Sequence, residues 1–260
     1  MLQKRSDGFH DIESIFYPVP IHDALELIKK DGDEETTLTL TNYGLPVNGA
    51  ISDNLCVKAW YLLKEGFPDL PFVKIHLLKN IPMGSGLGGG SADGAFMLQL
   101  LNDKFHLNLS TEQLTGYALQ LGSDCPFFIV NQPCYATGRG ENMEPISLNL
   151  SGHQLVLENP GIHIDTGNAF SQLDLNTAQN KPGHLKRVIQ QPIADWKENL
   201  NNDFEIPVFR QYPQIKVIKE KFYAEGALYA AMSGSGSTVY GLFKKSVGVK
   251  PAIGRTVVNF

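Results

Sequence analysis

Five glycines fall within the ten residues Pro82-Met83-Gly84-Ser85-Gly86-Leu87-Gly88-Gly89-Gly90-Ser91. Before this run, Phe72 to Leu78 is apolar and β-branched and predicts a strand, and after it Ala92 to Leu101 consists mostly of helix formers. Glycine allows positive φ and close backbone approach, and the first turn of a helix presents N–H groups and the positive end of its dipole. This order of elements therefore predicts a phosphate-binding loop.

Two well-known phosphate loops do not fit this run. The segment Gly84 to Gly89 matches the G-x-G-x-x-G dinucleotide fingerprint, but Leu101 to His106 is too polar and too short for the second strand of a Rossmann unit. A Walker A loop ends in Gly-Lys-Ser/Thr, whereas Gly90 is followed by Ser91 without a lysine. The catalytic motifs of protein kinases are also absent. The sequence predicts phosphate binding by another kind of loop.

A second loop of small residues, Met232 to Ser237, lies between the predicted strands Ala227 to Met232 and Thr238 to Phe243. It could serve only as a hairpin turn. Its three serines and two glycines, however, offer more hydroxyl and N–H donors than a tight turn uses. Two donor-rich loops suggest one site for a polyanion.

A single carboxylate, Asp124, stands directly before the apolar run Pro126 to Val130, which we expect to be a strand. An aspartate at such a boundary often caps a helix or a turn. If Asp124 lies in the phosphate site, it is the best candidate for a base that accepts a proton from a hydroxyl nucleophile.

The composition excludes several classes of protein. The 260 residues are 42% hydrophobic and 19% charged, as in folded chains with one large or two ordinary domains. The net charge of -5 and the lack of a dense Lys/Arg cluster argue against a nucleic-acid partner. The three cysteines, Cys56, Cys125 and Cys134, show no paired spacing, so we expect neither disulfides nor a thiolate metal site. This pattern favours a protein of the reducing cytoplasm. The start of the chain has no apolar stretch, so we expect a soluble protein without a membrane partner.

Six blocks of sequence together resemble the GHMP kinases and, within them, the kinases that act on a cytidine-diphosphate derivative of methylerythritol. The blocks are Lys4 to His10, Asp53 to Leu55, Pro82 to Ser91, Gly122 to Phe128, Gly138 to Glu141, and Ser233 to Ser237. The resemblance implies the α+β, two-domain GHMP kinase fold with the active site in the interdomain cleft. We place an N-terminal ATP-binding domain over residues 1–150 and a C-terminal domain over 151–260, divided at the polar bend Asn149-Leu150-Ser151.

The resemblance also implies roles for individual residues. For the nucleotide, it assigns the ATP phosphates to the loop Pro82 to Ser91, with Asn54 and Lys79 near the adenosine, although Asn54 could equally cap its own helix. It makes Asp124 the catalytic aspartate, with Mg²⁺ neutralising charge on the transferred phosphoryl group.

For the cytidine-diphosphate substrate, the resemblance implies stacking of Phe9 on the cytosine ring and recognition of its edge by His10. It places Phe170 on the second face of the base and adds Thr166, Gly234 and Ser235 as substrate-binding residues. The alternative for Phe9 and Phe170 is a role as core aromatics.

One family feature is missing from this chain: a leading strand with an Ala-Lys-x-Asn motif, whose lysine contacts the catalytic aspartate. We therefore expect either a shortened chain or an impaired enzyme. Two alternatives stay open, namely another small-alcohol kinase, such as a mevalonate or homoserine kinase, and a non-catalytic nucleotide- or CDP-binding protein. We expect a monomer or a homodimer.

Overall fold

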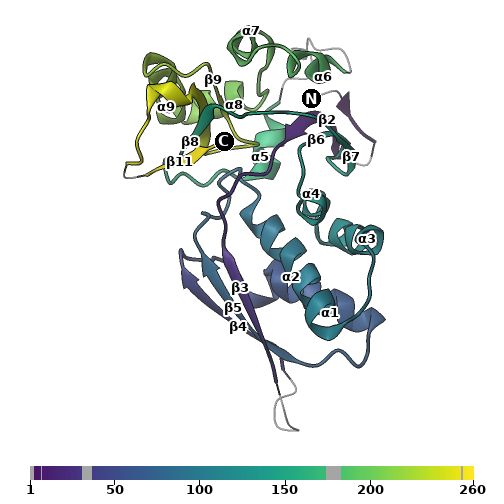
Figure 1. Ribbon diagram of the computed structural model, residues 1–260. Coiled ribbons are helices and arrows are strands. Elements are labelled where there is room, and N and C mark those ends of the chain that lie inside the picture. The colour runs from purple at the N-terminus through teal and green to yellow at the C-terminus, as the bar shows by residue number, and fades with distance from the viewer. Residues whose placement is uncertain (1–2, 7, 31–36, 174–182, 253) are drawn as a thin grey trace. The chain divides into compact units, whose positions relative to one another are not determined.

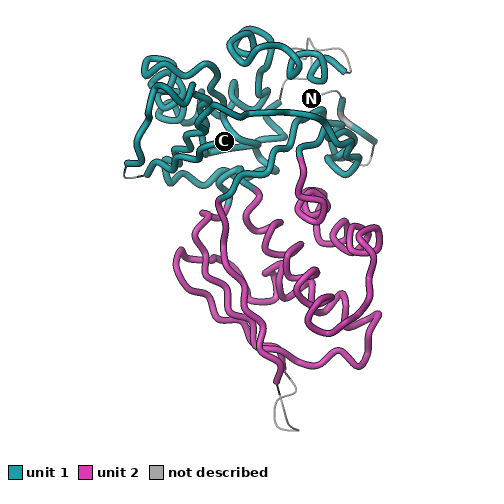
Figure 2. The backbone as a smooth tube through the Cα atoms, in the orientation of Figure 1, with its two compact units in different colours: residues 1–20, 84–87, 133–260 teal, residues 21–83, 88–132 magenta. Residues whose placement is uncertain are grey.

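The computed structural model describes residues 3–6, 8–30, 37–173, 183–252 and 254–260 (Figure 1). Contacts among its residues divide the chain into two compact units (Figure 2). Unit 1 comprises residues 1–20, 84–87 and 133–260, and unit 2 comprises residues 21–83 and 88–132. This division does not follow the expected boundary at residue 150, because the strand at 134–138 pairs with the N-terminal strand at 10–16 and the strand at 142–145 pairs with 134–138.

Unit 2 contains a three-stranded sheet in the order β3 (Ala24–Lys29), β5 (Val73–Lys79), β4 (Thr39–Gly44). β3 pairs antiparallel with β5, and β4 pairs parallel with it. Its helices are α1 (Leu55–Gly66), α2 (Gly89–Phe105), α3 (Thr111–Leu121) and α4 (Cys125–Val130), and a 3₁₀ turn, η1, covers Ile51–Asp53. α2 follows directly on the glycine loop, so the core of this unit holds the loop's helical end in place.

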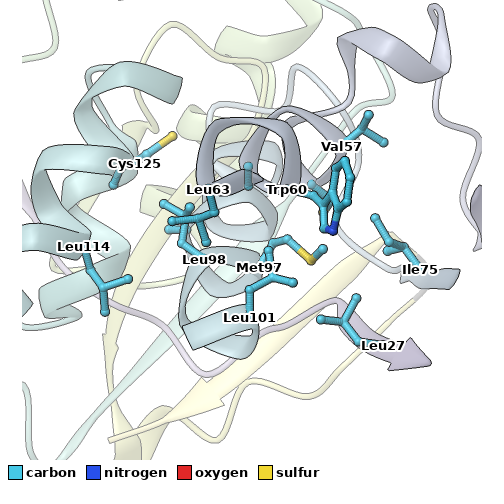
Figure 3. Close-up of a cluster of buried hydrophobic side chains, with 14 of the residues drawn as sticks. Leu27, Val57, Trp60, Leu63, Ile75, Met97, Leu98, Leu101, Leu114 and Cys125 are labelled. Carbon is cyan, nitrogen blue, oxygen red and sulfur yellow. The ribbon is translucent and has the colours of Figure 1, made fainter. Parts of the chain in front are cut away.

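The core of unit 2 lies between the sheet and helices α1 and α2 (Figure 3). β5 alternates buried and more exposed positions, and its buried residues include Val73, Ile75 and Leu77. The helices contribute Trp60 and Leu63 from α1 and Met97, Leu98 and Leu101 from α2. Removing this apolar surface from water is the main force that fixes α2 against the sheet.

The described residues of unit 1 form two four-stranded antiparallel sheets. The first has the order β1 (Gln3–Lys4), β2 (His10–Phe16), β6 (Cys134–Gly138), β7 (Asn142–Pro145). The second has the order β11 (Arg255–Asn259), β8 (His153–Glu158), β10 (Val239–Lys244), β9 (Tyr229–Met232).

Where the structure describes unit 1, its helices are α5 (Thr166–Ser171), α6 (His184–Val188), α7 (Trp196–Asn199), α8 (Glu205–Gln211) and α9 (Pro213–Ala224), with 3₁₀ turns η3 (Ile193–Asp195) and η4 (Lys245–Val247). α9 buries Ile215, Ile218 and Phe222, which recur at helical spacing, against the second sheet. No helix among the described residues combines the length and apolar character needed to span a membrane.

Most sequence-predicted elements are confirmed, and one is wrong. The side chain of Asn54 caps α1 by accepting from the N–H of Cys56 at 2.9 Å. The run Pro126 to Val130, expected to be a strand, belongs to helix α4. In a short apolar run, periodicity alone does not distinguish a buried strand from a buried helix. Pro126, in the first turn of α4, is compatible with a helix start.

Candidate active site

The part of the glycine loop that belongs to unit 1, residues 84–87, packs directly on the second loop. The hydroxyl of Ser233 donates to the carbonyl oxygen of Gly86 at 2.8 Å, and the N–H of Thr238 donates to that of Ser85 at 3.0 Å. Gly86 has φ +78°, and a Cβ there would lie 2.0 Å from the backbone oxygen of Ser233. Only glycine fits this position, so the two donor-rich loops are in contact, as the sequence suggested.

The rest of the loop leads into helix α2 of unit 2. Gly88 is the N-cap of α2 with φ +69°, and a Cβ there would lie 2.8 Å from the ring of Phe128. The first helical hydrogen bond runs from the N–H of Ala92 to the carbonyl of Gly88 at 2.9 Å. The N–H groups before Ala92 in the first turn therefore have no acceptor within the helix, and they can serve an anion.

Asp124 precedes α4, but its side chain makes no capping hydrogen bond to that helix. The capping role considered for it is therefore wrong. Asp124 is exposed, yet the protein around it removes enough water from the carboxyl to raise its pKa, against the opposing effect of a hydrogen bond with Ser123. A carboxylate with a raised pKa is a better proton acceptor than an ordinary aspartate.

The neighbouring thiol does not compete for this role. Cys125 is fully buried, and burial raises the pKa of its thiol to about 11, although a hydrogen bond with Ser91 of the glycine loop acts in the opposite direction. Cys125 is thus neutral near pH 7. Asp124 is the group in this segment that can accept a proton.

Lys79, expected near the adenosine, lies inside unit 2. Its side chain is fully buried, and its ammonium donates to the carboxylates of Asp23 and Asp93, the latter at 2.7 Å. Asp23 also accepts from the backbone N–H groups of Asn80 at 2.5 Å and Ile81 at 2.8 Å. Because the ammonium is already engaged by two carboxylates, its contact with a nucleotide stays a prediction.

This Asp23–Lys79–Asp93 triad lies under the first turn of α2. A Cβ on Gly89 would come within 3.1 Å of the Lys79 ammonium and within 2.9 Å of the side chain of Ile81. Burial raises the pKa of Asp93 to about 7, and the nearby Lys79 acts in the opposite direction. Sequence reasoning missed the two aspartates because they are far from Lys79 along the chain.

The raised pKa of Asp93 predicts a pH dependence of stability. Between pH about 4 and about 7 the unfolded chain has lost this proton while the folded unit still holds it, so stability falls as pH rises through this window. Asp93→Asn should flatten that part of the profile. Thermal unfolding across this pH range checks it, and a mutant profile as steep as that of the unsubstituted chain would contradict it.

Unit 1 brings together most residues expected to bind the substrate's cytidine end. The rings of His10 and Phe170 stack at 5.1 Å with an interplanar angle of 24°. Phe9 is 53% exposed, and the guanidinium of Arg139 lies 4.7 Å from its ring centroid. A role for Phe9 as a core aromatic is therefore wrong. Phe170 is half-buried and also packs edge-to-face on Phe204 at 4.9 Å.

The hydroxyls of Thr166 and Ser235 lie 3.0 Å apart, next to the exposed Gly234. Unit 1 thus holds all the residues expected to bind the substrate, and unit 2 holds Asn54, Lys79 and Asp124. The contact of Arg139 with the Phe9 ring was not predicted, although Arg139 lies in the Gly138 to Glu141 block that carried part of the resemblance.

Comparison with known proteins identifies the family. Models of the N-terminal and C-terminal domains of the GHMP kinases match residues 54–132 and 185–253. A 4-diphosphocytidyl-2-C-methyl-D-erythritol kinase from Bacteroides fragilis (strain YCH46) is 50% identical over 242 residues, which cover 93% of this chain and 86% of the relative. The chain belongs to this family of GHMP kinases. A kinase of the same name from Porphyromonas gingivalis is 40% identical over 261 residues, covering 100% of this chain and 91% of the relative.

Solved structures agree with this family. A crystal structure of 4-(cytidine 5'-diphospho)-2C-methyl-D-erythritol kinase aligns with a TM-score of 0.74 and 28% identity, over 92% of this chain and 83% of that one. A homoserine kinase from Cytophaga hutchinsonii, at 15% identity, aligns with a TM-score of 0.73 over 95% of this chain and 93% of that one, which shows the fold alone. The α+β GHMP kinase fold is confirmed, and as a GHMP kinase the chain is an ATP-dependent phosphotransferase.

Proposed function

We propose that this chain transfers the γ-phosphoryl group of ATP to the 2-hydroxyl of 4-(cytidine 5'-diphospho)-2-C-methyl-D-erythritol. The observation that carries the proposal is the 50% identity, over 93% of the chain, to a kinase named for this substrate. The exposed Phe9, next to His10 and its stacking partner Phe170, supports it, because an aromatic group beside a ring with two nitrogens suits a flat heterocycle with polar edges.

In this mechanism Asp124 accepts the proton of the 2-hydroxyl as the oxygen attacks the γ-phosphorus. A new oxygen–phosphorus bond forms, the bond between the γ-phosphorus and the bridging oxygen breaks, and ADP leaves with the electron pair. The raised pKa of Asp124 suits a base that must hold this proton during the transfer. The first turn of α2, capped by Gly88, supplies N–H donors for the phosphates of ATP.

A Mg²⁺ ion would be held mainly through the phosphates of ATP. Among the residues that the structure describes, no group of three or more His, Cys, Asp or Glu side chains could hold a metal ion. Mg²⁺ commonly takes one or two protein oxygens together with substrate phosphates, and Ser91 and Asp124 offer such oxygens. When bound, the ion neutralises charge on the transferred phosphoryl group.

A substrate panel tests the proposed function. The full chain is incubated with ATP and either the CDP-linked substrate, mevalonate or homoserine, and ADP and the phosphorylated product are measured. We expect turnover of the CDP-linked substrate and none of the two small alcohols. Turnover of mevalonate or homoserine instead would replace the proposal with another GHMP kinase activity.

Phe9→Ala should weaken binding of the CDP-linked substrate by about 1–3 kcal/mol, the range for losing an aromatic that stacks on a base. ATP affinity should hardly change, because the ring lies outside the glycine loop. Calorimetry with each ligand measures this effect, and Phe96→Ala, which removes another exposed ring from helix α2, is the control. Equal losses for both ligands, together with a large fall in the melting temperature, would assign Phe9 a packing role.

A further inference from the structure

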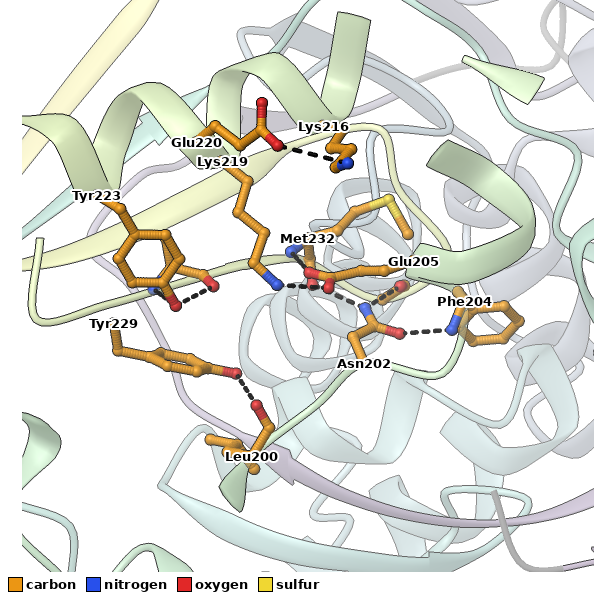
Figure 4. A network of polar contacts seen from close by, with 12 residues as sticks. Leu200, Asn202, Phe204, Glu205, Lys216, Lys219, Glu220, Tyr223, Tyr229 and Met232 are labelled. Carbon is orange, nitrogen blue, oxygen red and sulfur yellow. Dashed lines mark hydrogen bonds and ion pairs between the residues drawn. The ribbon is translucent and has the colours of Figure 1, made fainter. Parts of the chain in front are cut away.

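A polar network in unit 1 binds the backbone at the start of the second donor-rich loop, Met232 to Ser237 (Figure 4). The side-chain amide of Asn202 donates to the carbonyl oxygens of Met232 at 2.7 Å and Gly234 at 2.8 Å. The Glu205 carboxylate accepts from the N–H of Met232 at 2.8 Å. Two side chains from one short segment therefore bind the backbone where strand β9 passes into the loop.

This segment is itself firmly placed. Glu205 is 8% exposed, and its second carboxylate oxygen lies 2.5 Å from the ammonium of Lys219 on α9. The carbonyl oxygen of the Asn202 side chain accepts from the N–H of Phe204 at 3.0 Å. A buried carboxylate with both oxygens bonded, beside an amide that donates twice and accepts once, has few ways to move without losing a hydrogen bond.

The same segment also reaches the residues proposed to bind the cytidine end. Phe204 packs edge-to-face on Phe170, which stacks on His10. On the loop side, Ser235 bonds with Thr166. Asn202 thus bonds to Gly234, which precedes Ser235, and to Phe204, which packs on Phe170.

We propose that Asn202 and Glu205 are positioning residues that hold the Ser233 to Ser237 loop in the conformation that binds the CDP-linked substrate. The identity of the bound substrate rests on the proposed function, whereas the hydrogen bonds of Asn202 and Glu205 are observed in the structure. Asn202 holds the loop through two carbonyl oxygens, one at each side of Ser233. Glu205 fixes the end of β9 through the N–H of Met232, and Lys219 balances the charge of its buried carboxylate.

Asn202→Asp is the sharpest test, because it keeps the shape of the side chain and the acceptor for the Phe204 N–H. It replaces the donating amide group by an oxygen that faces two carbonyl oxygens. We expect KM for the CDP-linked substrate to rise roughly tenfold while kcat stays within about twofold, the size of effect for losing a hydrogen bond that orders a binding loop. A smaller folded fraction would lower the apparent kcat and leave KM unchanged.

Hydrogen exchange gives a second measurement that does not depend on activity. The N–H groups of Ser233, Gly236 and Thr238 all donate to backbone oxygens in the structure. In Asn202→Asp these loop amides should exchange faster, while those of α9 keep their protection. Unchanged exchange in the loop, or an unchanged KM, would overturn the proposal.

A second variant makes the test independent of how well Asn202→Asp folds, and a third serves as a control. Asn202→Ala removes both donors without adding charge and should raise KM in the same direction. The control is Glu220→Gln, which breaks the exposed Lys216–Glu220 pair on α9, also drawn in Figure 4, and should change neither KM nor loop exchange. If the unsubstituted chain fails to turn over the CDP-linked substrate, the proposed function fails, and the exchange experiment still decides whether Asn202 holds the loop.

Discussion

Asp124→Asn is expected to lower turnover by about 100-fold or more, the scale of lost general-base catalysis. Asparagine keeps the shape of the side chain but cannot accept the proton from the substrate hydroxyl. Because Asp124 makes no capping bond to α4, the substitution should cost little stability. Binding of ATP and of the CDP-linked substrate should remain nearly intact.

The pH dependence of kcat/KM is a second test of the role of Asp124. A base must be deprotonated to act, so kcat/KM of the unsubstituted chain should fall as pH drops through the pKa of this carboxyl, which desolvation by the surrounding protein raises. The residual activity of Asp124→Asn should lack this acidic limb. Asp103→Asn, at an exposed aspartate of α2, is the matched control and should behave like the unsubstituted chain. Near-normal turnover in Asp124→Asn would remove this residue from the mechanism.

The parts of the fold that the sequence predicted are those with a local signal. Asn54 was expected as a possible cap of its own helix, and the structure shows its side chain capping α1. The glycine run predicted the turn before α2, where Gly86 and Gly88 adopt positive φ. The apolar run that became α4 carried no such signal, since its six residues fit a buried strand and a buried helix equally well.

The parts of the site that the sequence did not predict depend on contacts between distant residues. Asp23 and Asp93 meet Lys79 from 56 and 14 residues away along the chain, and neither belongs to a recognisable motif. Asn202 reaches Gly234 from 32 residues away. Single residues of common types, at spacings set only by the tertiary fold, give no pattern that sequence reasoning can find. The aromatic block around Phe9 was found because its residues are adjacent in the chain.

Lys79→Met is expected to destabilise unit 2 by about 3–5 kcal/mol, the cost of removing one partner from a buried ion pair. Methionine fills much of the same space, so the main loss is electrostatic: the Asp23 carboxylate would stay buried without its cation, and Asp93 would lose the partner that lowers its pKa. Urea unfolding followed by the fluorescence of Trp60, which lies in the core of the same unit, measures the loss. A Trp196→Phe background removes the signal of the other tryptophan, which lies in unit 1.

Two comparisons separate this electrostatic cause from simple loss of packing. Lys58→Met removes an exposed lysine of the same unit from its 3.7 Å pair with Asp53, and it should cost less than about 1 kcal/mol. At pH 8, adding Asp93→Asn to Lys79→Met should recover part of the lost stability, because it removes a carboxyl that must either take up a proton or stay buried as an unpaired charge. If the double variant is no more stable than Lys79→Met alone, the lysine stem contributes through packing, and the triad does not stabilise unit 2 by charge.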